Sequence, residues 1–410
     1  MPTLLQINTS LNCNSTGRIA EQIGLLAKSN GWDCYIAHGP RYVKDTSLHS
    51  YQVESKTGEK IHWIKSLLLD GHGLSSTKAT KKFVKWIDSI HPDIIHLHNI
   101  HGYFLNYKIL FEYLKSSNIP AVWTFHDCWP ITGHCGYFSL EGCDRWRIGC
   151  GKCPLRWKEY PKSLIIDRSA NNYQLKKQLF GSLKHLYIVS VSKWLDSIIG
   201  DSFLSHIHHS YIYNGIDIDV FKPTTSNIRE NFGLQNKKVL LGVASIWTNR
   251  KALSDYIKLS QLLSEEYQII LIGPTEKQSK TIPDNIIVIS RTNSQSELVQ
   301  WYSAADILLN LSYEETFGLT TVESFACGTP SIVYNRTASP ELITKNTGIV
   351  VEAGNWKALI CAIEEIVSKG KNYYSTACRQ RAVEHFNKDD RFQDYINLYN
   401  ELLNEKDITR

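Results

Sequence analysis

The feature that most constrains the fold is a repeated alternation of short apolar runs with amphipathic, helix-like segments. Ten such runs lie at 4–9, 34–39, 94–99, 121–127, 187–192, 239–245, 269–274, 286–290, 306–311 and 331–334. Strands buried on both faces read as nearly continuous apolar runs, because helices cover both faces of a parallel sheet. The pattern therefore predicts an α/β protein built on doubly wound parallel sheets.

The length of the chain predicts two domains. A chain of 410 residues exceeds what one compact hydrophobic core usually contains. The best hinge candidate is the segment 208–223, in which Asn214-Gly215 is a strong turn signal. We therefore expect a first domain over 1–215 and a second over 216–384, with a helical segment over 385–410.

Composition excludes several classes of protein. Hydrophobic residues make up 42% and charged residues 21% of the chain, as in globular proteins. The N-terminus lacks a basic signal-peptide region, and no apolar run reaches the roughly 18 residues that a membrane span needs. A net charge of +5 is too small to indicate a nucleic-acid partner. We expect a cytoplasmic protein whose ten cysteines are reduced thiols.

The most informative motif is the segment 312–331, SYEETFGLTTVESFACGTPS, between two predicted strands. Glu315 falls in the loop, and Glu323 is expected about two turns into the following helix. Helical geometry then separates the two residues by roughly 12 Å. Paired glycosidase carboxylates work at about 5 to 9.5 Å, so this spacing argues against that mechanism. It suits two contacts on one long ligand, such as the sugar and ribose ends of a nucleotide sugar.

This segment resembles the E-x7-E element of retaining glycosyltransferases of family four, which have the GT-B architecture of two Rossmann-like domains facing a cleft. The alternative is an ordinary amphipathic helix with two exposed acids. The resemblance makes Glu315 a catalytic residue that positions the sugar, and it assigns donor binding to Thr316, Phe317, Gly318, Leu319 and Glu323. It also implies that the C-terminal helix over 385–410 packs back on the first domain.

Two basic residues, Arg250 and Lys251, follow the predicted strand 239–245 and precede a helix. A diphosphate leaving group needs fixed positive charge of this kind. In the resembling family, basic residues of this loop neutralise the donor diphosphate, although the usual glycine after the lysine is Ala252 here. The alternative is a solvated basic pair, which the dipole at a helix start disfavours.

Further donor contacts are implied at two other strand ends. Gly17 and Arg18 enter the helix after the first strand, where backbone amides can bind an anion. Ser15 or Thr16 acting as a plain N-cap is the alternative. Arg291 and Thr292 follow the strand 286–290, where doubly wound sheets place ligands, and the resemblance puts the nucleobase there.

Two histidine-containing strand ends are candidates for the reacting centre. The strand 121–127 ends in His126-Asp127, and the resemblance places such a histidine beside the transferred sugar. A capping His-Asp pair is the alternative. His98, Asn99 and His101 follow the strand 94–99 at the same sheet edge and, with Asp127, are acceptor candidates.

The resemblance implies transfer of a glycosyl (hexosyl) group from a nucleotide diphosphate sugar to a hydroxyl with retention, and no metal or cofactor for the chemistry. It points to surface polysaccharide synthesis (capsule, exopolysaccharide or lipopolysaccharide). The acceptor would be a polyprenyl-diphosphate-linked saccharide, reached by peripheral contact with the inner face of the plasma membrane. A soluble-acceptor sugar-phosphate or glucan synthase of the same fold is the second interpretation. A zinc-dependent nucleic-acid-binding module is a third, and the modest charge argues against it.

Half of the cysteines lie in an insert, 128–160, directly after His126-Asp127. Cys135, Cys143, Cys150 and Cys153 include a C-x2-C pair, and four thiolates at such spacings can bind Zn²⁺ tetrahedrally. His134 and Cys128 are spare ligands, and clustered buried thiols without metal are the alternative. We expect a structural zinc that stiffens an acceptor-binding lid.

Overall fold

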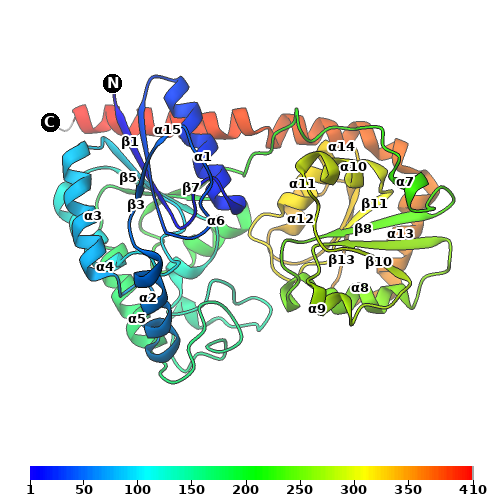
Figure 1. The fold of residues 1–410 in the computed structure, drawn as a ribbon, viewed down its shortest axis with the longest axis horizontal. Helices are drawn as coiled ribbons and strands as arrows, with labels where there is room; N and C mark the ends of the chain where they lie inside the picture. The colour runs from blue at the N-terminus through cyan, green and yellow to red at the C-terminus, as the bar shows by residue number, and fades with distance from the viewer. Residues whose placement is uncertain (409–410) are drawn as a thin grey trace. The chain divides into compact units, whose positions relative to one another are not determined.

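The computed structural model describes residues 1–408, which divide into two compact units (Figure 1). The N-terminal unit comprises Met1–Ile212 together with the C-terminal segment from Arg391, and the C-terminal unit comprises Tyr213–Asp390. The sequence places the boundaries a few residues away, after 215 and after 384. The structure has the two boundaries after Ile212 and after Asp390, where the chain passes from one unit to the other.

The N-terminal unit is built on a seven-stranded sheet in the order β3-β2-β1-β4-β5-β6-β7, and every pair of neighbours is parallel. Its strands are β1 (Thr3–Asn8), β2 (Asp33–His38), β3 (His49–Gln52), β4 (Ile94–Leu97), β5 (Ala121–Phe125), β6 (Leu186–Ser190) and β7 (His208–Tyr211). The strand order reverses between β1 and β4, and the carboxyl ends of these strands form one edge.

Helices surround this sheet (Figure 1). They are α1 (Asn14–Ser29), α2 (Lys56–Leu69), α3 (Thr77–Ile90), α4 (Tyr107–Ser117), α5 (Ser169–Phe180) and α6 (Lys193–Gly200), with the 3-10 turns η1 (Trp129–Ile131) and η2 (Arg145–Arg147). The long connection between β5 and α5 contains the cysteine-rich insert.

The C-terminal unit has a six-stranded parallel sheet in the order β10-β9-β8-β11-β12-β13. Its strands are β8 (Lys238–Val243), β9 (Tyr267–Ile272), β10 (Ile286–Ile289), β11 (Ile307–Asn310), β12 (Ser331–Tyr334) and β13 (Gly348–Val351). Its helices are α7 (Ile228–Asn231), the 3-10 turn η3 (Asn249–Lys251), α8 (Leu253–Ser260), α9 (Glu276–Ser279), α10 (Gln295–Ala304), α11 (Leu319–Ala326), α12 (Ser339–Leu342), α13 (Trp356–Lys369) and α14 (Lys371–Phe386). The strand order reverses between β8 and β11.

The predicted doubly wound parallel sheets are confirmed, and all ten apolar runs contain strands. Three further strands, β3, β7 and β13, are not among the predicted ones, and β7 lies inside the segment that the sequence assigns to the hinge. The strand β13 has an apolar run, GIVV, that the sequence analysis overlooks. All three are at sheet edges, and β3 and β7 are largely exposed. An edge strand pairs on one side only, so it needs no continuous apolar run.

The last helix, α15 (Lys388–Ile408), contributes to the core of the N-terminal unit. Its buried residues Phe392, Tyr395, Ile396 and Tyr399 pack in one cluster with side chains of β1, β2 and α1. The ring of Tyr399 meets that of Trp32 edge-on, with centroids 5.6 Å apart. Residues at the two ends of the chain thus complete one hydrophobic core.

The two passages between the units run side by side within the C-terminal unit. Ile216 donates its backbone N–H to Phe386 O at 2.8 Å, and Lys388 N donates to Ile216 O at 2.9 Å. A Cβ on Gly215 would lie 2.3 Å from the Lys388 Cα, so only glycine permits this approach. The Asn214-Gly215 signal therefore marks a backbone contact as well as a turn.

Candidate functional site

In the C-terminal unit, the candidate residues gather at the carboxyl ends of β8 and β11, where the strand order reverses. Open parallel sheets bind ligands at this point, because the loops from the two strands diverge and leave a crevice. The loop after β8 contains Arg250 and Lys251, and the loop after β11 contains Glu315. Two segments that are 64 residues apart in the sequence are thereby brought together.

Lys251 and Glu315 form an ion pair between the Lys251 Nζ and the Glu315 Oε1. Their side chains are 25% and 13% exposed, so neither is a freely solvated surface charge. Arg250 lies beside them: its backbone O accepts from Tyr313 N at 2.8 Å. The residues predicted to bind the diphosphate, Arg250 and Lys251, therefore lie in one charged cluster with Glu315, the residue predicted to position the sugar.

The path of this loop depends on Ala252, the position where the resembling family has glycine. Ala252 is fully buried and has a φ of 55°, in the left-handed region. That conformation costs a non-glycine residue about 1–2 kcal/mol, because its Cβ approaches the following carbonyl oxygen. Residue 252 therefore has a left-handed backbone conformation, which favours glycine, although it is an alanine in this chain.

The backbone of Glu315 is anchored by a segment that the sequence did not suggest. Glu315 N donates to the Thr337 Oγ1 at 2.8 Å, and Ala338 N donates to Glu315 O at 3.2 Å. Thr337 and Ala338 follow β12, the strand next to β11. The sequence does not predict these two hydrogen bonds, because Thr337-Ala338 belongs to no recognisable motif.

Tyrosines hold the neighbouring elements together around Asp255 of α8. The Asp255 Oδ2 accepts hydrogen bonds from the Tyr313 hydroxyl at 3.0 Å and the Tyr334 hydroxyl at 2.7 Å. Tyr313 lies two residues before Glu315, so α8 helps to position that loop. The sequence analysis missed Asp255, whose only signal is an acid in the first turn of a helix.

Glu323 is the fifth residue of α11. The expected placement about two turns into the helix is wrong by nearly one turn, because α11 begins only at Leu319. The Glu323 Oε2 accepts a hydrogen bond of 2.8 Å from the hydroxyl of Tyr302, a buried residue of α10. Burial, and next the charge of Glu323, raise the pKa of Tyr302, which keeps that hydroxyl a donor.

The other predicted donor residues occupy different environments. Gly318 has a φ of 108° at the start of α11, a conformation that favours glycine. Phe317 is buried between the rings of Tyr213 and Phe386, so its side chain is part of the core. Thr316 and Leu319 are half-buried on either side of Phe317-Gly318.

Arg291 and Thr292 follow β10, which is the outermost strand of this sheet. Arg291 is exposed and Thr292 is half-buried. Two strands, β9 and β8, separate β10 from β11 in the sheet order. Within residues 1–408, no hydrogen bond or ion pair joins this pair to Lys251 or Glu315.

In the N-terminal unit, histidines occupy the corresponding edge, at the ends of β4 and β5. His101 Nε2 lies 2.9 Å from the Asp127 Oδ2, and His98 Nδ1 lies 3.1 Å from His126 Nε2. The backbone N of Asn99 donates to the Asn8 Oδ1 at 3.2 Å. The predicted candidates therefore form two buried pairs, His98–His126 and His101–Asp127, at one edge of the sheet.

Burial keeps two histidines of this edge, His98 and His126, neutral. It lowers the pKa of His126 to about 4 against a smaller opposing effect of Asp127, and it holds the pKa of His98 well below its usual range. Both rings are therefore neutral near pH 7. For Asp127, burial favours the neutral acid, but His101 and the N–H of Trp129 outweigh it and lower the pKa. Asp127 is a carboxylate that orients His101.

Gly17 and Arg18 have distinct roles in α1. A Cβ on Gly17 would lie 2.6 Å from the Ser10 Oγ, so glycine allows the helix to pack against the loop after β1. Arg18 is exposed, and its Nε donates to Asn14 O at 3.1 Å. The helix begins with Cys13 as the N-cap, without a side-chain cap. The alternative of Ser15 or Thr16 as the N-cap is therefore wrong.

The four predicted zinc ligands gather within the insert. Cys135, Cys143, Cys150 and Cys153 line a cavity of about 20 Å³, and none of the ten cysteines forms a disulfide. A hydrogen bond from the Cys135 thiol lowers the pKa of Cys153 to about 7. Across residues 1–408, however, no three His, Cys, Asp or Glu side chains are arranged to hold a metal ion. The spare ligand His134 instead pairs with Asp70 at 2.6 Å.

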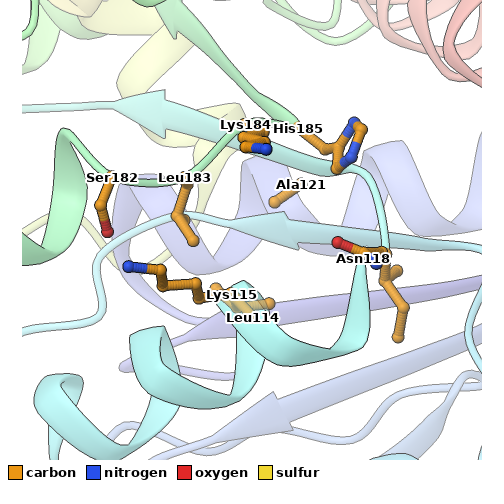
Figure 2. Close-up of a pocket in the computed structure, with 9 residues that line it drawn as sticks. Leu114, Lys115, Asn118, Ala121, Ser182, Leu183, Lys184 and His185 are labelled. Carbon is orange, nitrogen blue, oxygen red and sulfur yellow. The ribbon is translucent and has the colours of Figure 1, made fainter.

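A cavity of about 240 Å³ lies elsewhere in the N-terminal unit (Figure 2). It is bordered by the C-terminal end of α4 and by residues 182–185, which precede β6. Ala121, the first residue of β5, also lines it. The cavity is therefore at the amino ends of the strands, opposite the edge that carries the histidines, and we do not assign the site to it.

Two family models together cover most of the chain. Residues 53–220 match the model described as Glycosyltransferase Family 4, and residues 224–383 match Glycosyl transferases group 1. The "Putative colanic acid biosynthesis glycosyl transferase WcaC" of Escherichia coli (strain K12) is 24% identical over 76% of this chain and 77% of its own. A 41.2 kDa protein in the cps region of Klebsiella pneumoniae is 22% identical over 93% and 96%.

Solved structures share the fold at low sequence identity. Sucrose-phosphate synthase from Thermosynechococcus elongatus superimposes with a TM-score of 0.73 at 16% identity, covering 99% of this chain and 100% of the other. Anabaena Alr3699/HepE in complex with UDP gives a TM-score of 0.67 at 13% identity, covering 98% and 100%. Similarity at this level establishes the arrangement of elements and leaves the chemistry to the residues of this chain.

Proposed function

Because the chain belongs to the GT-B glycosyltransferases, with a Family 4 domain followed by a group 1 domain, we propose that it is a retaining hexosyltransferase that uses a nucleotide diphosphate sugar. The carrying observation is the Lys251–Glu315 pair beside Arg250 at the reversal of the second sheet. This cluster joins fixed positive charge to a carboxylate, which suits a ligand with a diphosphate and a sugar.

The proposed chemistry is electrostatic. The bond between the anomeric carbon and the diphosphate oxygen breaks, and Arg250 and Lys251 stabilise the charge that develops on the leaving group. The acceptor oxygen bonds to the same face of the anomeric carbon, and its proton passes to the departing phosphate. Glu315 positions the sugar, and Glu323 binds the ribose. None of these steps requires a metal.

The histidine edge of the N-terminal unit is proposed to receive the sugar and the acceptor. A neutral imidazole has one donor and one acceptor nitrogen, which matches the hydroxyl groups of a saccharide. His126 supplies such a ring beside the sugar. In the His101–Asp127 pair, the Asp127 carboxylate fixes the orientation of the second ring. A site for a neutral sugar needs directed hydrogen bonds more than net charge.

For the acceptor, we propose a polyprenyl-diphosphate-linked saccharide in surface polysaccharide synthesis. The support is the name of the WcaC relative and the cps location of the Klebsiella relative. No helix within residues 1–408 is long and apolar enough to cross a bilayer, so such an acceptor would be reached by peripheral contact. The competing candidate is a soluble sugar-phosphate acceptor, suggested only by structural similarity to sucrose-phosphate synthase.

A thermal-shift screen with UDP, GDP, ADP and their sugars tests the donor site. We expect one nucleotide series to raise the melting temperature, with UDP tried first because Alr3699/HepE was solved with it. The shift should weaken in Glu323→Ala and persist in Glu276→Ala, an exposed acid on α9. If no nucleotide stabilises the protein, the donor proposal is wrong.

The structural zinc stays a prediction, because the four thiols surround one cavity without an arrangement suited to metal. Metal analysis of protein purified under reducing conditions tests it. About one zinc per chain, lost in Cys150→Ser/Cys153→Ser, would support the zinc site. A content well below one would show a cluster of buried thiols.

A further inference from the structure

Gln6 is an unusual residue for the centre of a parallel sheet. It lies in β1, between β2 and β4, and its side chain is fully buried. Central strands of such sheets are normally apolar on both faces, and a buried amide costs free energy unless it is hydrogen-bonded. A Cβ on Gly24 would lie 2.8 Å from the Gln6 Nε2, so a glycine in α1 makes room for this amide. The fold therefore accommodates a polar side chain that packing does not require.

The partners of Gln6 determine which way its amide group faces. The Gln6 Nε2 donates to the Ala20 O at 2.8 Å, and a carbonyl oxygen can only accept. The amide oxygen of Gln6 therefore faces His98, whose Nε2 lies 3.0 Å from it. Since an amide oxygen also only accepts, the proton of this hydrogen bond must be on the His98 Nε2.

The proton on the His98 Nε2 fixes the role of the other ring nitrogen. Burial lowers the pKa of His98 and of His126, so each ring carries one proton near neutral pH. The His98 Nδ1 is then an acceptor, and the His126 Nε2, which lies 3.1 Å away, must donate to it. A neutral His126 with its proton on Nε2 has an unprotonated Nδ1.

The two imidazole rings are oriented for this hydrogen bond. Their centroids are 5.4 Å apart, which exceeds the distance between the two nitrogens by about the sum of the ring radii. Their planes differ by 22°, so the nitrogens point at each other. The backbone of His98 is also held, because His98 N donates to Ile7 O at 2.9 Å and Trp123 Nε1 donates to His98 O at 3.0 Å. These contacts keep the His98 ring between Gln6 and His126.

We propose that Gln6 and His98 are positioning residues that hold His126 in one tautomer, so that its Nδ1 accepts a hydrogen bond from a hydroxyl of the transferred sugar. His126 is 8% exposed, whereas Gln6 and His98 are 0% and 1% exposed, so His126 is the member of this chain that a ligand can reach. Because its Nε2 faces His98, a ligand meets the ring at Nδ1. A site built to pair with a hydroxyl rejects an analogue that lacks the donor.

The contact with the sugar rests on the proposed function, whereas the tautomer is a property of the protein alone. The tautomer is therefore measured first, without donor or acceptor. Long-range proton–nitrogen correlation NMR of the full chain, with isotope-labelled histidine, distinguishes protonated from unprotonated ring nitrogens near neutral pH. The signals of His126 are those that disappear in His126→Gln. We expect a protonated Nε2 and an unprotonated Nδ1, and the opposite tautomer or an equal mixture would overturn the proposal.

Gln6→Met removes the amide that fixes the proton of His98 and keeps a side chain of similar length. We expect the His126 signals to move toward a mixture of tautomers. Transfer from the donor that the thermal-shift screen identifies should lose about threefold to tenfold in kcat/KM, the effect of one hydrogen bond. The matched control, Gln52→Met at an exposed position of β3, should change neither. An unchanged tautomer, or an unchanged kcat/KM, in Gln6→Met would contradict the proposal.

Two variants of His98 separate positioning from packing. His98→Gln keeps an acceptor for His126 and a donor for Gln6, whereas His98→Leu fills the space without either. We expect His98→Gln to retain the His126 tautomer and most of the activity, and His98→Leu to lose both. Equal activity in the two variants would mean that His98 only fills space, which would overturn the proposal. If His98→Leu does not fold, the unmodified protein and Gln6→Met still decide the question.

Donor analogues in which one hydroxyl at a time is replaced by fluorine test the direction of the hydrogen bond to the sugar. Fluorine cannot donate, so one analogue should react more slowly with the unmodified protein, and Gln6→Met should discriminate less against it. Equal discrimination by both proteins against every analogue would overturn the contact. If no nucleotide binds but His126 has the expected tautomer and responds to Gln6→Met, the proposed function fails and the positioning of His126 stands.

Discussion

The carboxyl edges of the two sheets differ in chemistry although they share a topology. In both units the strands are parallel and the order reverses at one pair, β1/β4 in the first and β8/β11 in the second. The first edge carries buried histidines whose pKa values lie below their usual range. The second carries the Lys251–Glu315 ion pair with Arg250 beside it.

The difference shows how one sheet topology supports two kinds of recognition. The ends of parallel strands supply only positions, and the loops supply the groups that contact a ligand. The neutral imidazoles of His98 and His126 suit hydroxyl groups, whereas fixed charges suit a diphosphate. The comparison makes a definite claim: charge is essential at the second edge, and neutrality is essential at the first.

The largest expected effect is loss of turnover in Lys251→Ala. Removing a charge that stabilises the leaving diphosphate should lower kcat about 10²–10³-fold. Transfer of radiolabelled sugar from the donor, once identified by the thermal-shift screen, measures this. The control is Lys277→Ala, an exposed lysine on α9. A Lys251→Ala enzyme with nearly unchanged kcat would remove the claimed role of charge at the second edge.

The first edge is tested by the pH dependence of stability. His126 has a folded pKa of about 4 and an ordinary value of 6.5, so between these values the unfolded chain binds more protons. The free energy of unfolding should therefore fall as pH drops from 6.5 toward 4, by at most about 1.4 kcal/mol per pH unit for each such histidine. Above pH 6.5 the ring is neutral in both the folded and the unfolded chain, so His126 adds no further change of the free energy of unfolding with pH.

Urea unfolding at several pH values, followed by tryptophan fluorescence, gives this slope. His126→Gln should reduce it, whereas His185→Gln, at an exposed position, should leave it unchanged. An identical slope in both variants would mean that His126 is not held neutral by folding. The contrast between the two edges would then lose its electrostatic basis.

A smaller effect is expected from Tyr302→Phe, which removes the hydroxyl that donates to Glu323. Loss of one hydrogen bond to a charged group is worth about 1.5–3 kcal/mol at most. We expect a several-fold rise in the donor KM with kcat nearly constant, because Glu323 is proposed to bind the ribose. Tyr395→Phe, at a buried tyrosine of α15, should not change the donor KM. A change in kcat alone would place Glu323 in the chemical step instead.

The smallest effect concerns the loop that presents Lys251. Ala252→Gly should stabilise the C-terminal unit by about 1 kcal/mol, because glycine adopts a φ of 55° without the Cβ clash. The greater entropy of glycine in the unfolded chain reduces this gain. A rise in melting temperature with unchanged kcat is the expected result. A fall in melting temperature would show that the Ala252 methyl contributes more through packing than it costs in strain.

Local patterns predicted the parts of the site that are local in the chain. The apolar runs identified the central strands, and the Glu315 to Glu323 spacing identified a loop followed by a helix. The helix start was misplaced, because Gly318, the N-cap of α11, has a φ of 108° that the sequence does not predict. Edge strands such as β3 were missed because exposure removes the apolar pattern. The role of Phe317 in donor binding stays a prediction, and its side chain is buried in the core.

By itself, the sequence determined the fold class and the positions of the charged and histidine-bearing loops, because both follow from periodicity and from motifs of a few residues. Only the tertiary structure decided which groups meet: Lys251 with Glu315, Glu315 with Thr337, His101 with Asp127 and Tyr302 with Glu323. It also decided that α2 turns its polar side inward. Such pairings join residues tens of positions apart, and the register and packing of the sheets set them.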